Sequence, residues 1–443
     1  MRYNGGFIMK RLIIILSLLL ALSLWAEQIV IGEAENQVRL VSSNQSRSRL
    51  ELTLGSFERE SVMIDNQEWY LPRLDKAGLT LEAGFPEVPV LAGSVIIPAN
   101  AKMELDIVHS EYIELEMPIA PSKGNLTRDI DPDTVPYTFG AVYNSNENYP
   151  STQAYLTDAF ILRDYRGITV RFQPFVYYPA QNITRIYTRI VVDVVTNGTD
   201  NTNTLSTAKS SFAPEFRGIY ENMFLNFAEA KYPSLDEEGR ILVITNSMFD
   251  GVIEPWVNWK RQMGYTVDVV DVTVAGPTAN NIKTFIQNQY DLNNGLKYVQ
   301  LMGDAPQVPS LSSGGGGSDP SYALLAGADS YPDIYVGRFS AQTVAEMQTQ
   351  IDRSIYYERD VQADADWLQR GMGIASNEGG GSQGDNGESD QQHMELIRTD
   401  LLGYGYTTVD QMYQTMGATA TQVGTNVNAG RGFINYVGHG STT

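Results

Sequence analysis

The strongest constraint on the fold of this chain is a change in its hydrophobic pattern at residue 240. Before that point, apolar and polar residues alternate in short runs that are separated by Pro, Gly and Asn. Alternation with a period of two is typical of strands with one buried face. It is clearest at residues 90–97, 105–108, 168–172 and 186–195. Short strands with frequent turn residues predict an all-β, sandwich-like domain, which we assign to residues 27–197.

After residue 240, short apolar runs alternate with stretches of helical spacing. Strands are predicted at residues 241–245, 266–272, 298–302, 334–336, 371–376 and 433–437, and helices at residues 249–263, 279–290, 344–361 and 391–402. Strands alternating with helices indicate a doubly wound, mostly parallel α/β sheet in residues 240–443. Active sites of such sheets lie beyond the carboxyl ends of the strands. Chemistry is therefore expected in the loops after Met302, Ser376 and Val437.

Residues 198–239, between these two regions, are interpreted as a linker. Its first part, residues 198–211, is rich in Thr, Asn and Ser, and residues 212–239 look irregular. Exposed, irregular chain is where proteolytic cleavage concentrates. Arg217 and Arg240 are therefore candidate processing positions.

The N-terminus has the pattern of a signal peptide, assigned to residues 1–26. The positively charged Lys10 and Arg11 precede an apolar run at residues 12–24. This run is shorter than the about 20 residues that a transmembrane helix needs. We expect a protein that passes the export machinery and is secreted or stays at the cell surface. An N-terminal membrane anchor is the alternative.

Composition narrows the classes of partner and chemistry. Acidic residues outnumber basic ones by 52 to 31, and the formal net charge is −21. Such a charge repels nucleic acid and anionic lipid. The chain contains no cysteine. Disulfides, thiolate metal sites and thiol catalysis from within these residues are therefore excluded.

Of the three histidines, His439 has the context of a catalytic group. It follows a predicted buried strand and lies between Gly438 and Gly440. Small neighbours let a substrate backbone approach, and the Gly440 N–H can face a developing oxyanion. A surface-loop histidine beside a turn is the alternative. His109, in the β region, is interpreted as a structural or surface residue.

An acidic, glycine-rich loop follows the strand predicted at residues 371–376. Glu378, close behind this strand, is placed to orient an imidazole, as the acid of a catalytic triad does. Asp390, just before the next predicted helix, is placed to hold a cationic substrate side chain. The alternative is a solvated loop in which Ser389 or Asp390 caps the helix.

Calcium binding is a further reading of the acidic residues. Carboxylate oxygens are the ligands that Ca²⁺ prefers. One candidate set is Asp385, Glu388, Asp390 and His393. A second, less specific set is Asp319, Asp329 and Asp333.

Three stretches resemble the gingipain family of cysteine peptidases, whose fold is caspase-like. They are SDPSYALLAGADSYPDIYVGRFSA (residues 318–341), IASNEGGGSQGDNGESDQQH (374–393) and NYVGHGS (435–441). The β region is similar to the family's propeptide at GFPEVPVL, residues 84–91. The resemblance implies an endopeptidase precursor that acts on protein or peptide substrates and that its own propeptide inhibits intramolecularly.

The resemblance also implies roles for single residues. His439 matches the catalytic histidine, Gly440 the backbone donor of the oxyanion hole, and Glu378 the acid that orients the histidine. Asp390 matches the specificity residue of the arginine-cleaving members, which implies cleavage after Arg, with Lys as second choice. The family's nucleophilic cysteine follows the histidine, so it is expected beyond Thr443. Residues 1–443 alone are then expected to be inactive, and the resemblance implies no required cofactor, with calcium as a structural ion.

Two other functions stay open at this point. Some gingipain relatives are sortase-like components of the type IX secretion pathway. A catalytically inactive surface-binding protein would retain the fold without the chemistry. A cysteine encoded shortly after His439 would argue against the inactive protein.

Overall fold

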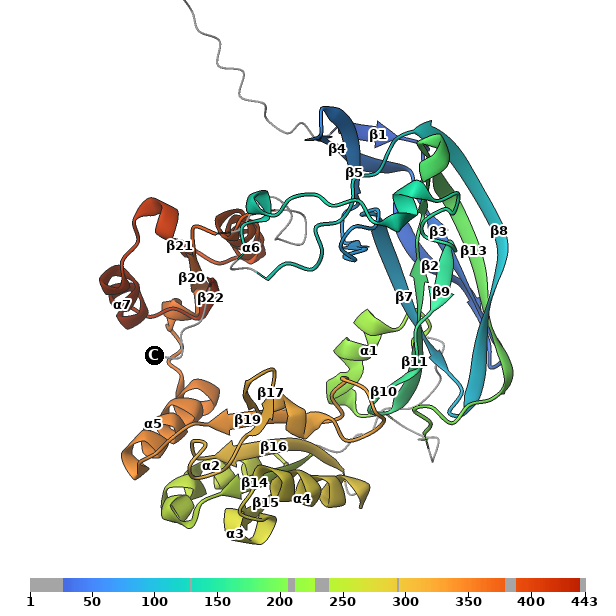
Figure 1. Ribbon diagram of the computed structural model, residues 1–443. Helices are drawn as coiled ribbons and strands as arrows, with labels where there is room; N and C mark the ends of the chain where they lie inside the picture. Colours follow the sequence, from blue (N-terminus) through green and yellow to red (C-terminus); the bar gives the residue numbers. More distant parts are fainter. Residues whose placement is uncertain are drawn as a thin grey trace, which may run out of the picture.

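The computed structural model describes residues 27–127, 130–205, 212–227, 239–292, 295–378 and 388–438. An all-β body precedes an α/β part whose strands form two separate parallel sheets (Figure 1). The predicted signal peptide lies outside the described residues. Within those residues, no helix is long and apolar enough to cross a membrane.

Antiparallel strands make up the all-β body, which we call the prodomain body after the propeptide that its sequence resembles. One sheet has the order β1 (Glu27–Val30), β4 (Ser56–Ile64), β5 (Gln67–Arg73). A second has the order β10 (Phe160–Leu162), β11 (Tyr165–Phe172), β7 (Pro89–Ile97), β6 (Gly78–Leu79), with β9 (Ala154–Leu156) paired to β11. The third has the order β12 (Phe175–Tyr178), β13 (Ile183–Thr199), β3 (Arg47–Thr53), β2 (Gln37–Ser43), with β8 (Ala101–Glu116) paired to β13.

The core of the prodomain body lies between the second and third sheets. Leu50 and Leu52 of β3 pack with Val95 of β7, Val170 of β11 and Val192 of β13. All five side chains are fully buried. The two sheets share one core through the side chains on their facing sides. The predicted sandwich-like class is confirmed.

Residues 212–227, expected to be irregular, form an ordered segment that we call the aromatic arm. It contains η4 (Pro214–Phe216) and α1 (Arg217–Met223). Its aromatic side chains Phe212, Phe216, Tyr220, Phe224 and Phe227 are buried. They are buried in a cluster with Phe160, Leu162 and Tyr165 of β10 and β11. The arm is therefore packed structure rather than a loose linker.

Both candidate processing positions lie in regular structure. Arg217 is the first residue of α1 and forms an ion pair with Glu221. Arg240 is the first residue of β14, and its backbone N–H donates to the carbonyl of Gly295. The other linker residues, 206–211 and 228–238, lie outside the described residues.

A four-stranded parallel sheet begins the α/β part. Its order is β15 (Thr266–Asp271), β14 (Arg240–Thr245), β16 (Leu296–Met302), β19 (Tyr335–Phe339). Helices α2 (Asp250–Gln262) and α5 (Val344–Ile355) pack on one face. Helices α3 (Val272–Ala275) and α4 (Ala279–Asp291) pack on the other. A short hairpin of β17 (Leu311–Ser313) and β18 (Gly316–Ser318) follows β16. The doubly wound arrangement agrees with the pattern of the sequence.

A second parallel sheet has the order β21 (Thr408–Tyr413), β20 (Arg370–Ala375), β22 (Phe433–Val437). Helix α6 (Asp390–Tyr404) packs on it, and α7 (Ala420–Asn428) lies between β21 and β22 in the chain. The parallel α/β class is confirmed. The sequence patterns did not reveal β21 and α7, and they gave no sign that the strands divide into two sheets. The helix predicted at residues 344–361 ends as α5 at Ile355 and continues as a π-helical turn.

Candidate functional site

The three loops in which chemistry is expected do not all leave the same sheet. The loop after Met302 leaves the four-stranded sheet, where the Gly303 N–H donates to the carbonyl of Phe339. The loops after Ser376 and Val437 both leave the three-stranded sheet. They are joined by a 3.0 Å hydrogen bond from the Ser376 N–H to the carbonyl of Val437. Of the predicted site residues, Glu378 and Asp390 are described, and both lie at the carboxyl edge of the three-stranded sheet.

Asp390 is held at this edge as a buried carboxylate. Ser389 is the N-cap of α6, and Asp390 is the first helical residue with only 3% of its surface exposed. The Ser376 hydroxyl donates a 2.5 Å hydrogen bond to Asp390 Oδ2. The Asp390 N–H donates to the carbonyl of Glu378 at 3.0 Å. A carboxylate in the first turn is stabilised by the partial positive charge of the helix N-terminus. The side chain therefore has a fixed position.

A glycine in β20 allows α6 to lie close to the sheet. A Cβ atom at Gly373 would come within 2.5 Å of Met394 Cγ. Met394 is one turn inside α6 and is buried in the small core of this sheet with Ala375 and Tyr413. The close approach of helix and strand brings the start of α6 beside Ser376.

Ser376 is the site residue that sequence reasoning missed. Its Oγ accepts a hydrogen bond from the Glu378 N–H at 3.1 Å while it donates to Asp390. The hydroxyl therefore joins the two predicted acidic residues. The sequence carries a signal for this, because a Ser two residues before a backbone N–H commonly forms such a turn.

His439 and Gly440 lie outside the described residues, so their roles stay predictions. The chain just before them is described. A Cβ atom at Gly438 would lie 2.8 Å from Tyr436 Oη and 3.2 Å from Ser376 Cβ. The backbone that leads into His439 therefore passes directly beside the serine that holds Asp390.

Calcium binding stays a prediction, and several residues of the two candidate sets have partners within the protein. His393 Nδ1 forms a 2.7 Å hydrogen bond with Glu388 Oε1, and Asp385 lies outside the described residues. Asp319 forms a bidentate ion pair with Arg338. In the part of the chain that the structure describes, no three His, Asp or Glu side chains are grouped as metal ligands would be.

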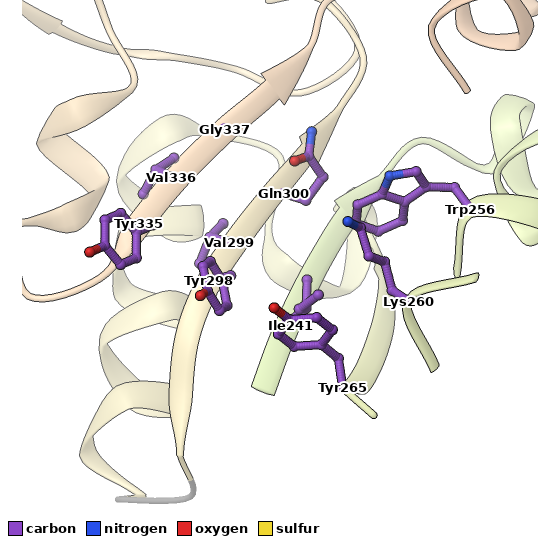
Figure 2. Close-up of a pocket in the computed structure, with 10 residues that line it drawn as sticks. All are labelled: Ile241, Trp256, Lys260, Tyr265, Tyr298, Val299, Gln300, Tyr335, Val336 and Gly337. Carbon is purple, nitrogen blue, oxygen red and sulfur yellow. The ribbon is translucent and has the colours of Figure 1, made fainter. Parts of the chain in front are cut away.

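A cavity of about 280 Å³ lies elsewhere, on the α2 side of the four-stranded sheet (Figure 2). Its wall includes Trp256, Tyr298 and Tyr335, and Lys260 at its rim forms an ion pair with Glu358. It holds none of the predicted site residues. It is not the candidate active site.

His109, the histidine of the prodomain body, has an exposed side chain that bonds Glu111 at 2.8 Å. This fits a surface residue.

Family models match nearly the whole described chain. The model of peptidase family C25 matches residues 234–443, and the model named Propeptide_C25 matches residues 29–224. The second match ends inside the aromatic arm.

Curated relatives come from Porphyromonas gingivalis. Gingipain R2 is 38% identical over 413 residues, which cover 92% of this chain and 56% of that protein. Gingipain R1 is 36% identical over 425 residues, covering 95% of this chain and 42% of that protein. Lys-gingipain is 26% identical over 462 residues, covering 98% of this chain and 26% of that protein. The chain therefore spans about half the length of gingipain R2 and less of the others.

Two solved structures are also similar. The Arg-specific cysteine proteinase gingipain R is 37% identical, with a TM-score of 0.45 over 48% of this chain and 50% of that chain. The complex of pro- and mature domains of RgpB from P. gingivalis is 34% identical, with a TM-score of 0.41 over 44% of this chain and 98% of that chain.

Proposed function

Because this chain belongs to peptidase family C25 and carries that family's propeptide, we propose that it comes from the precursor of an exported cysteine endopeptidase that cleaves after arginine. Identity supports arginine over lysine, since it is 36–38% to gingipains R1 and R2 and 26% to Lys-gingipain. The observation that carries the proposal is the buried carboxylate of Asp390.

Asp390 suits a guanidinium ligand. A planar guanidinium pairs with a carboxylate through two parallel, charge-assisted hydrogen bonds. Burial strengthens such a pair because little water competes for the charges. Hydrogen bonds that join Asp390 to Ser376 and Glu378 fix the position of the Asp390 carboxylate before substrate binds. This lowers the entropy cost of binding.

In the proposed reaction, a thiolate attacks the scissile carbonyl and forms a C–S bond. Gly440 N–H donates to the oxyanion, and the imidazolium of His439 gives its proton to the departing amine. Water then hydrolyses the thioester and restores the thiol. Glu378 orients His439. The sequence of residues 1–443 contains no cysteine, so the thiolate in this proposal comes from another part of the protein.

Export and latency belong to the same proposal. The charged and apolar pattern of residues 1–26 supports passage through the export machinery. The propeptide supports synthesis as an inactive precursor. Cleavage between the prodomain and the α/β part then yields the active enzyme outside the cell or on its surface.

The full-length, processed protein tests the proposed chemistry on peptides with Arg before the scissile bond. Thiol alkylation should abolish cleavage, and His439→Ala should lower kcat by about 10³-fold or more. His109→Ala is the control for folding of the precursor, since that exposed imidazole lies in the prodomain body. Full activity after alkylation, or after loss of His439, would reject the proposal.

A further inference from the structure

We propose that Ser376 is a positioning residue that makes the recognition of arginine and the orientation of the catalytic histidine depend on each other. Its hydroxyl holds the side chain of Asp390 and the backbone of Glu378 at the same time. The inference rests on the proposed function, from which it takes the pairing of Asp390 with a guanidinium and of Glu378 with His439. What it adds is a physical link between the two acids, made by a side chain that takes no part in the reaction.

The Ser376 hydroxyl uses both of its hydrogen-bonding capacities. It donates to Asp390 Oδ2 at 2.5 Å, and its oxygen accepts from the Glu378 N–H at 3.1 Å. A hydroxyl can donate and accept at once, whereas a carboxylate only accepts and an ammonium only donates. Asp390 is 3% exposed, so little water is at hand to replace a lost partner. Removal of the hydroxyl therefore takes a donor from a buried carboxylate and an acceptor from a backbone N–H.

The three residues form a closed ring of hydrogen bonds. The Ser376 hydroxyl donates to the Asp390 carboxylate, the Asp390 N–H donates to the Glu378 carbonyl at 3.0 Å, and the Glu378 N–H donates back to Ser376. The backbone of Glu378 is thus held on both sides by the two residues that hold each other. Hydrogen bonds in such a network polarise one another, so the loss of one member weakens the rest. A shift of the Asp390 side chain is therefore passed on to Glu378.

The sheet, rather than the acidic loop, fixes the position of this ring. The Ser376 N–H donates to the carbonyl of Val437 at the end of β22. A Cβ atom at Gly438, the next residue, would lie 3.2 Å from Ser376 Cβ. Helix α6, which carries Asp390, contacts both β20 and β22 (Figure 1). Ser376 therefore lies where the ends of two strands and the start of one helix meet.

Two consequences follow for the proposed reaction. A guanidinium binds a carboxylate through two parallel hydrogen bonds, so its affinity depends on how well the carboxylate plane is fixed. The rate depends on the orientation of the histidine, and a displacement of about 1 Å in an active site can cost about 10²-fold. Ser376 thus contributes to binding through Asp390 and to the rate through Glu378.

The test compares Ser376→Ala with the wild type as full-length, processed protein. The two peptide substrates differ only in having Arg or citrulline before the scissile bond, since citrulline has nearly the shape of arginine without its charge. For the Arg peptide, we expect KM to rise about 10-fold and kcat to fall about 10-fold. For the citrulline peptide, only kcat should fall. Agmatine, a guanidinium ligand without a peptide bond, should inhibit Ser376→Ala with a Ki raised about 10-fold.

Gln414→Ala is the matched control. Gln414 Oε1 accepts from the Asn377 N–H at 3.2 Å, so this substitution loosens the residue next to Ser376 without breaking the ring. Its KM, kcat and Ki should stay within about 3-fold of the wild-type values. If Gln414→Ala reproduced the pattern of Ser376→Ala, a loosened loop would explain both results and the proposal would be overturned.

A pair of changes at Asp390 tests the link from its other end, and it decides the question even if Ser376→Ala folds poorly. Asn at this position keeps an oxygen that can accept from the Ser376 hydroxyl, whereas Ala does not. On the citrulline peptide, Asp390→Ala should therefore lower kcat about 10-fold, and Asp390→Asn about 3-fold or less.

Two results would overturn the inference and leave the proposed function standing. One is a KM for the Arg peptide that Ser376→Ala does not change. The other is an equal kcat of the two Asp390 variants on the citrulline peptide. Failure of the proposed function is seen in the wild type instead, which would then not cleave the Arg peptide or would still cleave it after thiol alkylation.

Discussion

Asp333 and Asp390 are both buried aspartates of the α/β part, with 0% and 3% of their surface exposed, but they lie in very different surroundings. Asp333 precedes β19 on the amino side of the four-stranded sheet. Its oxygens accept from three backbone N–H groups, those of Arg163, Leu325 and Ala326. Asp390 lies at the carboxyl edge of the other sheet, at the start of α6. The Ser376 hydroxyl donates to its Oδ2 atom.

The difference teaches that burial alone does not mark a recognition residue. An aspartate whose oxygens bind several backbone amides fixes the chain that carries those amides. An aspartate in the first turn of a helix, at the carboxyl edge of a parallel sheet, lies where sheets of this class bind ligands. The identity of the donors and the edge of the sheet decide between these roles.

The largest effect expected from this comparison is on substrate choice. Asp390→Asn should lower kcat/KM of the full-length, processed enzyme for Arg peptides by about 10²–10³-fold, since it removes the charge that pairs with the guanidinium. Peptides with an uncharged residue at that position should change far less. Asp400→Asn, on the exposed side of the same helix, is the control. An equal loss on all substrates would mean that Asp390 only holds the loop.

The next effect concerns stability. Asp333→Ala leaves three backbone N–H groups without their acceptor, and those of Arg163 and Leu325 are buried. The free energy of unfolding of the uncut precursor should therefore fall by about 2–4 kcal/mol. Asp352→Ala, on the exposed surface of α5, should cost about 0.5 kcal/mol or less. Urea unfolding monitored by circular dichroism measures both. Equal effects of the two substitutions would contradict a structural role for Asp333.

The smallest effect is a dependence on pH. Burial raises the pKa of Asp333 to about 6, against the opposing effect of its backbone donors. Because the pKa is higher in the folded state, this stabilising contribution is complete below pH about 4 and is lost as pH rises through 6. Between pH 4 and 7, the free energy of unfolding of the precursor should therefore fall by about 1–3 kcal/mol relative to that of Asp333→Asn. If the free energies of unfolding of the two proteins changed in parallel with pH, the raised pKa of Asp333 would be contradicted.

Local sequence patterns identified the fold class of each half of the chain, because apolar residues recur at different spacings in strands and in helices. They did not identify β21, where Asp410 and Gln411 interrupt the apolar run. Nor did they show which strands pair, since pairing joins residues far apart in the chain. The α/β part therefore looked like one sheet and is two.

The sequence of the aromatic arm carries a signal for helical structure. Phe212, Phe216, Tyr220 and Phe224 recur at every fourth residue, which is the spacing of one helical face. At the site, Glu378 and Asp390 were singled out by their positions in the acidic loop, and the resemblance implied their roles. Ser376, which binds both, is 14 positions from Asp390 and reaches it only because α6 folds back onto β20.

That the arm is hydrogen-bonded to the prodomain body has a consequence for proteolysis. A protease binds its substrate as extended chain, so a cut after Arg217 requires α1 to unfold locally first. The rate of that cut should therefore report the free energy of opening the arm.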